Sequence, residues 1–377
     1  MRGITSLIRE LSWVMPLGML GLMALVLLRP WPVLSAPADY GTVVTDARGV
    51  AVSLPLPPRG VAHAFLRSFV QKTHAPHLLL NCGRVKDRRD FRGSVAGWLY
   101  PQLVENDRCW NADSDLESLL AHDTPGAVYF GDIWFSGTMF DTASLRSLGL
   151  TAMATRSVAA EEPEEAMFTE IRTLNAALGQ SKLAESLIDA YRESLARLAQ
   201  VLRPDTVPLQ EWPRMMGLGA PHDDWSRLFV TRGSDPRIAI REAVGGNQAS
   251  GREQDAERVL AMDPDIIVLL VSDPAGFYRD PRWRGLTAVS DHRVYANNPA
   301  FHGYVHDLDN LPLSARWKAE IAHPDRLQSS LREQIRTRYR ETYGYEMSDE
   351  HIDELLRMQE NADSAGYARF ARKQIAP

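Results

Sequence analysis

The feature that most constrains the fold is a long amphipathic run, Ser181–Leu202, which contains neither glycine nor proline. Its apolar residues recur every three or four positions, as on one face of a helix: Leu183, Ala184, Leu187, Ile188, Tyr191, Leu195, Leu198 and Leu202. Ser181 is the expected N-cap, Gly179 separates the run from an earlier helix, and Pro204 follows its end. A helix of this length spans roughly 33 Å. The sequence therefore predicts a stiff connector with no hinge.

The composition is that of an ordinary globular protein with room for two domains. The chain has 377 residues, of which 45% are hydrophobic and 24% are charged. Its formal net charge is −6, whereas nucleic-acid-binding proteins normally carry a basic excess. We therefore expect no nucleic-acid partner.

Residues 1–38 have the pattern of an export signal. Arg2 and Arg9 give a basic start, residues 11–28 are largely apolar, and the sequence A-P-A at 36–38 offers small residues for cleavage. The alternative is an uncleaved membrane anchor, because residues 11–28 approach the roughly 20 apolar residues that span a bilayer. We favour cleavage, since the small residues follow the apolar run at a suitable distance.

The cysteine count excludes a disulfide scaffold. The chain has two cysteines, Cys82 and Cys109, which lack the spacing of metal ligands. Export would favour one disulfide between them, and the alternative is a pair of buried thiols. We favour the disulfide.

Short apolar strands alternate with helices on both sides of the connector, which predicts an α/β fold with mainly parallel sheets. Before the connector we expect a hairpin at 41–55, helices from Ser114 to 121 and at 144–149, and strands at 78–80, 127–130 and 151–155. After it we expect helices at 238–244, 255–262 and 283–289, strands at 214–218, 266–271 and 293–295, and a helical tail from 327 with Ser348 as a cap.

A short internal sequence repeat indicates that the two sides of the connector are related lobes. Residues 115–123 and 255–263 share Asp, Glu, Leu, Ala and Asp at the same offsets, and each segment precedes a proline-containing turn and a buried strand. We therefore expect two lobes, each with a mainly parallel sheet flanked by helices, joined by a long rigid helix. The predicted division is a signal peptide at 1–38, an N-terminal lobe at 39–160, a helical connector at 161–204, and a C-terminal lobe with a helical tail at 205–377.

These features resemble the periplasmic substrate-binding proteins of iron-siderophore and vitamin B12 ABC importers, the class with two α/β lobes and a helical connector. The resemblance covers nearly the whole mature chain and rests on the order of several segments rather than on one motif. They are T-D-A-R-G-V-A-V-S-L-P with Pro58-Arg59, the two D-x-E segments, Gly245-Gly246-Asn247, D-P-D-I-I-V-L-L, W-R-G-L-T-A-V-S-D-H-R-V-Y-A-N-N-P, and the tail from L-P-L-S-A-R-W-K to S-D-E-H-I-D-E-L-L.

The resemblance implies a periplasmic, monomeric binding protein rather than an enzyme. It would need no cofactor, would capture a metal chelate, with a ferric siderophore favoured over haem, corrinoid or nickel chelates, and would deliver it to an ABC permease. In the family, one glutamate on each lobe docks on permease arginines; by position these are Glu117 and Glu257. The alternative for Glu117 is a capping-box glutamate. That explanation does not extend to Glu257, which has no Ser or Thr three residues earlier.

Ligand contacts are expected on loops at the carboxyl ends of the strands, between the lobes. Aromatic side chains there would line an apolar wall, and arginines would pair with a negatively charged chelate. The candidates are Trp134, Trp225, Arg227, Arg232, Tyr278, His302 and Tyr304, with His306 nearby; a packing or surface role is the alternative for each. The pattern His302-x-Tyr304-x-His306 lacks a carboxylate partner, so we predict no protein-held metal.

Two other classes of function remain open from the sequence. A secreted α/β enzyme is disfavoured because the chain lacks G-x-S-x-G, H-E-x-x-H, a Walker-type glycine loop and G-x-G-x-x-G. A membrane-tethered sensor of the same fold would require residues 11–28 to remain uncleaved.

Overall fold

The amphipathic run forms helix α10 (Ser181–Leu202), with the limits that the sequence predicted. Ser181 is already helical, because the backbone N–H of Ala184 donates to the carbonyl of Gln180, so the predicted N-cap lies one residue too late. The preceding helix α9 (Pro163–Ala177) is followed two residues later by Gly179, whose φ of +71° favours glycine. Met167, Phe168 and Ile171 of α9 pack against Leu187, Ile188 and Tyr191 of α10.

The computed structural model describes residues 42–62, 69, 72–80, 92, 94–103, 105, 126–131, 141–155, 163–202, 213–219, 228–234, 252–254, 256–269, 273–297 and 310–372. All of these residues belong to one compact unit, Tyr40–Pro377. Among the described helices, none combines the length and the apolar character needed to cross a membrane.

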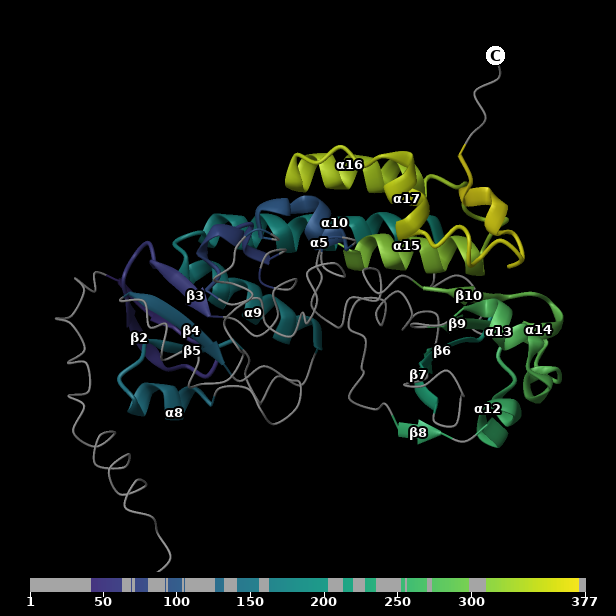
Figure 1. Cartoon of the computed structure of the whole chain (residues 1–377), viewed down its shortest axis with the longest axis horizontal. Helices are drawn as coiled ribbons and strands as arrows, with labels where there is room; N and C mark the ends of the chain where they lie inside the picture. The colour runs from purple at the N-terminus through teal and green to yellow at the C-terminus, as the bar shows by residue number, and fades with distance from the viewer. Residues whose placement is uncertain are drawn as a thin grey trace, which may run out of the picture. The chain divides into compact units, whose positions relative to one another are not determined.

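The first sheet has three parallel strands, in the order β3 (Gly60–Ala62), β4 (Ala127–Gly131) and β5 (Ala152–Ala154) (Figure 1). All residues of these strands are buried, as expected for a sheet covered on both faces. Helix α8 (Thr142–Ser147) leads into β5 and packs on it through Leu145. Strand β3 was not predicted.

The predicted hairpin is formed by β1 (Thr42–Thr45) and β2 (Ala51–Leu54). Its turn is held by Asp46, a buried carboxylate that accepts hydrogen bonds from the backbone N–H groups of Arg48 and Val50 at 2.9 Å each. The same carboxylate pairs with Arg146 and accepts from the N–H of Ala154 in β5. Burial opposes ionisation, but these bonds together lower the pKa of Asp46. Asp46 therefore fastens the hairpin to the first sheet.

The strand predicted at residues 78–80 is replaced by a 3₁₀ helix, η2 (Pro76–Leu78), and one parallel bridge between Leu79 and Val61. Proline at the first position of η2 sets a helical φ, so pairing with β3 begins only at Leu79, and the N–H of Leu80 donates to the carbonyl of Val61 at 2.8 Å. A Cβ added to Gly60 would lie 2.6 Å from Cδ2 of Leu80. The glycine therefore allows this segment to approach the strand closely.

The second sheet has five strands in the order β10-β9-β6-β7-β8. The strands are β6 (Met215–Gly219), β7 (Leu228–Ser234), β8 (Arg252–Gln254), β9 (Ile266–Leu269) and β10 (Val294–Ala296). Strands β10, β9 and β6 are parallel, whereas β7 and β8 extend the sheet in antiparallel pairing. The predicted fold class, α/β with parallel strands flanked by helices on either side of α10, is confirmed. The antiparallel extension was not predicted.

Among the described residues, three α-helices pack on one face of this sheet: α12 (Ala256–Met262), α13 (Pro274–Arg279) and α14 (Thr287–Ser290). The single helix predicted at 283–289 was wrong, because the chain forms η6 (Pro281–Trp283), leaves the helical conformation at Leu286 (φ −82°, ψ 136°) and then starts α14. Asp263 decides this break, since its carboxylate accepts hydrogen bonds from both the backbone N–H and the hydroxyl of Thr287.

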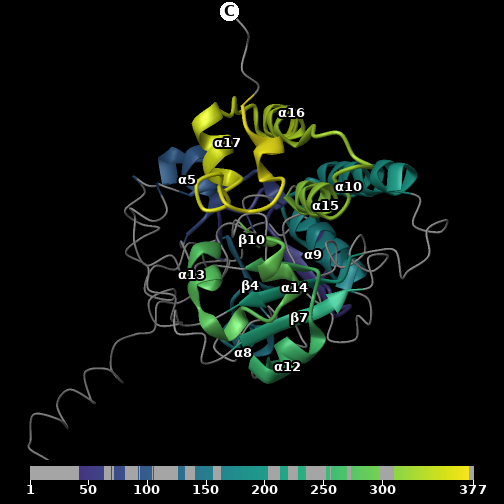
Figure 2. The ribbon, with the colours of Figure 1, turned by 90° about the vertical axis from the view of Figure 1, so that its right-hand side faces the viewer.

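The tail forms α15 (Asn310–Ala322), α16 (Leu331–Tyr343), α17 (Asp349–Leu355) and the 3₁₀ helix η7 (Tyr367–Phe370). The predicted cap is confirmed, because the Ser348 hydroxyl accepts from the N–H of His351 at 3.1 Å. Figures 1 and 2 both place α15 beside β10, where Leu313 and Trp317 share an apolar cluster with Tyr295.

Helix α5 (Val95–Leu99) lies between two apolar clusters. The first-sheet core is the cluster of Val61, Val128, Phe130, Met153, Leu174 and their neighbours, and it includes Ala96 and Leu103. The second-sheet core is the cluster of Ile266, Val268, Tyr295, Trp317, Ile335, Tyr339, Ile352 and their neighbours, and it includes Val95, with Trp98 and Leu99 packed against it. The short helix therefore contributes side chains to both cores.

Candidate ligand-binding edge of the sheets

The carboxyl ends of the parallel strands form the candidate site, because in open α/β sheets ligands bind at that edge. In the first sheet the edge comprises Ala62, Gly131 and the residue after β5, Thr155. In the second sheet it comprises Gly219 and Leu269 and, after β10, Asn297. Thr155 and Asn297 are fully buried, which makes them the polar residues to account for.

The polar groups of Thr155 find their hydrogen-bond partner within the first sheet. Its backbone N–H donates to the carbonyl of Gly131 at 3.3 Å, and its hydroxyl contacts the same oxygen at 3.4 Å. The side chain therefore continues the pairing of β5 with β4 by one residue. This accounts for a buried hydroxyl without any ligand.

Asn297 is different, because only its backbone is paired. The backbone N–H donates to the carbonyl of Leu269 at 2.9 Å, which extends the ladder between β10 and β9. The side chain is 0% exposed, and neither Oδ1 nor Nδ2 has a hydrogen-bond partner among the described residues. Leaving a buried polar group unsatisfied costs about 1–3 kcal/mol. Asn297 was not among the predicted ligand contacts, although it lies directly after a predicted strand.

Tyr278 was predicted on a loop at this edge, but it lies on helix α13. Its hydroxyl is 3.1 Å from both the backbone nitrogen and the carbonyl oxygen of Val294, the first residue of β10, and its ring packs on His292. Burial raises the pKa of the Tyr278 phenol. These contacts fasten α13 to the opposite end of β10 from Asn297. A role for Tyr278 in ligand binding stays a prediction.

The other predicted contacts lie where the structure describes no side chain. Arg232 lies on β7, of which the backbone alone is described at this position. The remaining predicted residues lie outside the described part of the chain: Trp134, Trp225, Arg227, His302, Tyr304 and His306, the docking residue Glu117, and the cysteines Cys82 and Cys109. The predicted helices from Ser114 to 121 and at 238–244 also lie outside it.

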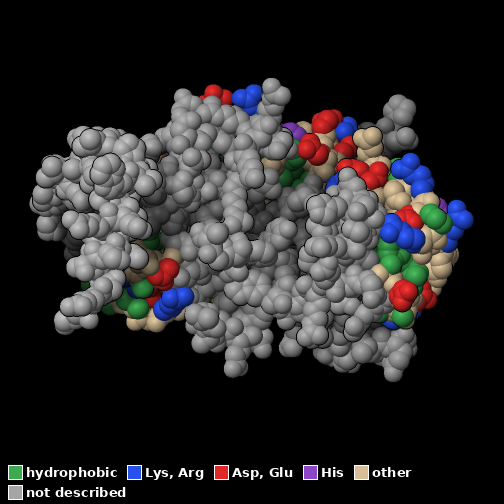
Figure 3. Space-filling model, turned by 60° about the horizontal axis from the view of Figure 1, so that its bottom comes forward, with side chains coloured by type: hydrophobic (Ala, Val, Ile, Leu, Met, Phe, Trp, Pro, Cys, Tyr) green, Lys and Arg blue, Asp and Glu red, His purple; other side chains and the backbone are tan. Residues whose placement is uncertain are grey.

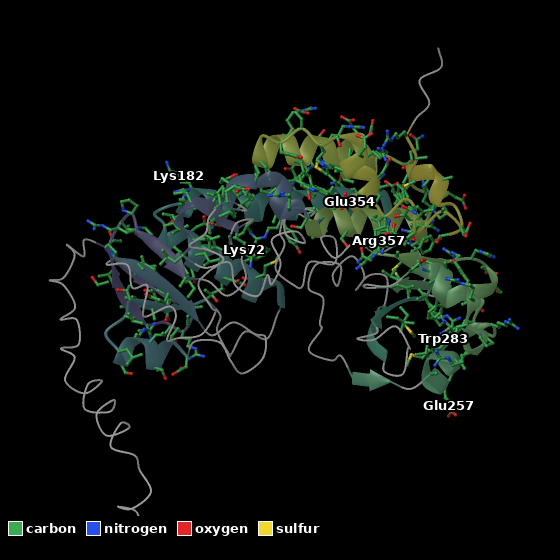
Figure 4. All side chains as sticks on the ribbon, in the orientation of Figure 1. Lys72, Lys182, Glu257, Trp283, Glu354 and Arg357 are labelled. Carbon is green, nitrogen blue, oxygen red and sulfur yellow. The ribbon has the colours of Figure 1, made fainter. Side chains whose placement is uncertain are left out.

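Glu257 lies in the first turn of α12, is exposed, and projects away from the ribbon (Figure 4). No ion pair joins it to another described residue. A carboxylate at this position is favoured by the helix dipole. The space-filling view shows that the described surface around α12, α13 and α14 mixes acidic, basic and apolar side chains (Figure 3). Within the described part of the chain, Glu257 is therefore an exposed carboxylate outside any ion pair.

The element that carries Glu257 is well anchored at its other end. Asp263, just after α12, bonds to Thr287, and these hydrogen bonds lower the pKa of the Asp263 carboxyl. Asp265 is half-buried; burial opposes ionisation, but hydrogen bonds from the side chain and backbone of Arg214 lower its pKa. Arg214 also donates to the carbonyl of Met262, the last residue of α12. The helix is thus fixed to the start of β6 and β9.

Within the described residues, no three His, Cys, Asp or Glu side chains lie close enough together to hold a metal ion.

No protein-family model matches the chain, and no curated protein matches its sequence. Solved structures do match. A periplasmic solute-binding protein from Veillonella parvula superposes with a TM-score of 0.65 at 21% identity, over 85% of this chain and 98% of that one. The chain has the fold of the periplasmic solute-binding proteins. An ABC-transporter solute-binding protein from Sulfurospirillum deleyianum matches with a TM-score of 0.62 at 16% identity, over 84% of this chain and 99% of that one.

A third structure of this fold holds a ligand. The molybdate periplasmic binding protein MolA of Haemophilus influenzae, bound to molybdate, matches with a TM-score of 0.61 at 17% identity, over 81% of this chain and 99% of its own. The three matches extend over almost the whole length of the solved proteins. The chain therefore contains the complete solute-binding fold.

Proposed function

We propose that this protein is a periplasmic solute-binding protein that captures a metal chelate and delivers it to an ABC permease. A ferric siderophore is the chelate class that we favour. The observation that carries the proposal is the match of the whole fold to solved proteins described as periplasmic solute-binding proteins. The protein would be exported by residues 1–38 and act as a monomer without a cofactor of its own.

The proposed mechanism depends on recognition of the loaded state. The solute binds at the carboxyl ends of the parallel strands, where open α/β sheets generally bind their ligands. The loaded form then docks through Glu257 and, by position in the resemblance, Glu117, whose carboxylates pair with permease arginines. ATP hydrolysis by the partner subunits drives release of the solute. In support, Glu257 is exposed and stands on a helix anchored by Asp263 and Arg214.

The choice of solute is tested by binding. Protein purified gently from its own host is measured by native mass spectrometry, and purified apo-protein is titrated calorimetrically with a defined panel. The panel contains a ferric trihydroxamate, a ferric tris-catecholate, haem, cobalamin, molybdate and Ni²⁺. We expect an organic metal chelate to bind and to raise the midpoint of thermal unfolding, because a ligand that binds the folded state stabilises it. Failure of the whole panel to bind would overturn the proposal.

The docking step is tested separately with the reconstituted permease. Replacing Glu257 with alanine should reduce the ATPase stimulation by loaded protein about tenfold or more, while solute affinity stays unchanged. The matched control is Glu341→Ala, which removes another exposed glutamate, on α16. Equal stimulation by the Glu257 variant and the control would show that Glu257 does not dock.

A further inference from the structure

We propose that the carboxamide of Asn297 binds the solute directly, and that it selects an organic ligand carrying both a hydrogen-bond acceptor and a hydrogen-bond donor. The proposal rests on the solute-binding function proposed above and adds to it a contact residue and a ligand chemistry. It is carried by a buried side chain whose polar atoms lack partners at the edge where this fold binds ligands.

The position of Asn297 follows from strand register. Ala296 is paired with Leu269 at the carboxyl ends of β10 and β9, and the N–H of Asn297 donates to the carbonyl of Leu269 at 2.9 Å. Asn297 is therefore the first residue beyond the parallel strands. Its backbone is held by the sheet, so its side chain is presented from a rigid element, as a binding residue requires.

Strand alternation indicates the face on which the side chain lies. Successive side chains of a strand point to opposite faces. Val294 packs with Ile267 and Leu269 on one face, whereas Tyr295 packs with Trp317 on the other. Asn297 continues the face of Tyr295, which is the face that α15 covers. The carboxamide is thus expected between the sheet edge and α15.

A second buried asparagine, Asn361, shows how a structural carboxamide bonds to the same strand, β10. Oδ1 of Asn361 accepts from the N–H of Ala296 at 2.7 Å, and Nδ2 donates to the carbonyls of Ala296, at 3.0 Å, and Arg357, at 3.1 Å. Asn361 is also 0% exposed, but its polar atoms are paired. The two asparagines have the same burial and opposite hydrogen-bonding states. Hydrogen bonds to the backbone therefore explain why the Asn361 carboxamide is buried, whereas the burial of the Asn297 carboxamide still needs an explanation.

The chemistry of the carboxamide limits what can satisfy it. One atom donates and the other only accepts, so a bare oxyanion such as molybdate can satisfy Nδ2 alone, and a bare metal cation can satisfy Oδ1 alone. An organic chelate with amide or hydroxyl groups satisfies both atoms. Because Asn297 is fully buried, such a ligand reaches it only when this edge opens locally, so we also expect association well below the diffusion limit.

The test compares Asn297→Ala and the near-isosteric Asn297→Leu with the wild type, using the panel described above. We expect the wild type to bind an organic chelate rather than molybdate or Ni²⁺, and each variant to bind that chelate about tenfold more weakly or worse. We also expect the apo form of Asn297→Leu to unfold at the same temperature as the wild type or higher, because it loses no hydrogen bond. The control is Ser364→Ala, which removes a 2.6 Å hydrogen bond to Val294 at the other end of β10 and should leave affinity unchanged.

Each outcome is decisive. If the wild type binds a chelate and both Asn297 variants bind it equally well, the solute-binding function stands and the contact is disproved. If apo Asn297→Leu is strongly destabilised, the carboxamide is structural and the proposal fails. If the wild type binds molybdate or Ni²⁺ instead of a chelate, the proposed ligand chemistry is wrong. If it binds nothing in the panel, the proposed function itself fails.

Discussion

An ion pair closed to solvent lies in the core beside α9. Nζ of Lys72 is 2.8 Å from Oε1 of Glu170, and their side chains are 0% and 1% exposed (Figure 4 labels Lys72). Nδ2 of Asn175 donates to the carbonyl of Lys72 at 2.8 Å, which joins the same segment to α9. Removing water from two charges costs several kcal/mol per ion, and their attraction offsets that cost only while both are present.

This geometry predicts strong coupling between the two charges. Lys72→Met alone should lower the free energy of unfolding by about 3–5 kcal/mol, because it leaves the Glu170 carboxylate buried without its cation. The double variant Lys72→Met, Glu170→Leu should recover most of that loss. Urea unfolding of the wild type, Lys72→Met, Glu170→Leu and the double variant measures the coupling. Additive losses would show that the pair is not coupled.

His323 is a buried histidine at the end of α15. It is 9% exposed, and burial, together with the charges of Arg326 and Arg293, lowers its pKa from 6.5 to about 4. Between these pH values the unfolded chain binds more protons than the folded chain. The stability due to neutral His323 is therefore complete above pH 6.5 and is lost as the pH falls toward 4.

The histidine predicts a pH-dependent free energy of unfolding. Since one pKa unit corresponds to 1.36 kcal/mol, this site should remove about 2–3 kcal/mol between pH 7 and pH 4.5. Urea unfolding at both pH values should show a smaller difference for His323→Gln than for the wild type. His77→Gln removes an exposed imidazole and serves as the control. An unchanged difference in His323→Gln would contradict the assignment.

At the scale of secondary-structure elements, the outer edge of β10 is covered, within the described part of the chain, by side chains rather than by a further strand. Asn361 pairs with both backbone groups of Ala296, and Ser364 and Tyr278 bond to those of Val294. An uncovered edge strand is a template for pairing with another chain. The segment after α17 therefore completes the second sheet.

Removal of the Asn361 side chain should expose the outer edge of β10. Asn361→Ala should lower the free energy of unfolding by about 2–4 kcal/mol, since it leaves the N–H and carbonyl of Ala296 unsatisfied. Aggregation on mild heating, followed by light scattering, should also increase. Asp363→Ala, an exposed change two residues later, is the control and should have little effect. A decrease in the free energy of unfolding below about 1 kcal/mol would argue that the Asn361 side chain contributes little to stability.

Helix α5 is fastened to the tail by stacked rings. The Trp98 ring lies parallel to the His351 ring, with centroids 4.2 Å apart, and Nδ1 of His351 is 3.0 Å from the hydroxyl of Tyr345. Tyr100 meets Tyr343 edge to face at 6.3 Å. The contacts of Trp98 with His351 and of Tyr100 with Tyr343 join residues more than two hundred positions apart in the sequence.

Loss of the stacking should loosen α17 without disturbing the connector. In Trp98→Ala we expect hydrogen exchange of the α17 backbone to speed up markedly, while exchange in α10 stays as in the wild type. Phe168→Ala provides the reciprocal control, because Phe168 packs on Tyr191 of α10, with ring centroids 5.6 Å apart. Equal acceleration of α17 in both variants would show general destabilisation rather than a local contact.

At the scale of the whole molecule, the described residues form one compact unit with more than one apolar cluster. Two elements connect the clusters. Ala96 of α5 lies in the first-sheet core and Val95 in the second-sheet core, while α10 packs on α9 through Ile188 and on α15 through Leu198. Unfolding of either sheet would therefore expose apolar surface that belongs to the other.

This arrangement predicts a single cooperative unfolding transition. Differential scanning calorimetry of the full chain should show one endotherm, with the calorimetric enthalpy equal to the van't Hoff enthalpy. Trp98→Ala should broaden the endotherm or split it, because it weakens one of the two connections. Two resolved endotherms in the wild type would mean that the sheets unfold independently.

The sequence determined the elements whose signals are local. The period of the apolar residues in Ser181–Leu202 placed the end of α10 at Leu202 and its start to within one residue, because an amphipathic helix of this length is recognised without knowledge of its partner. The hairpin at 41–55 and the cap at Ser348 were predicted for the same reason, since each depends on bonds within a few residues. The buried strands β4 and β9 were also found close to their observed limits.

Only the tertiary structure decided the features that depend on distant partners. Asp263 breaks the helix predicted at 283–289 from 24 residues away, and the antiparallel strands β7 and β8 depend on pairing that no local pattern specifies. Tyr278 carried the aromatic signal of a ligand contact, yet its hydroxyl is engaged by β10. Asn297 carried no signal beyond following a strand, because an unsatisfied carboxamide is recognised only when its burial and its neighbours are known. Sequence periodicity reports which residues avoid water, whereas hydrogen-bond satisfaction is a property of the assembled fold.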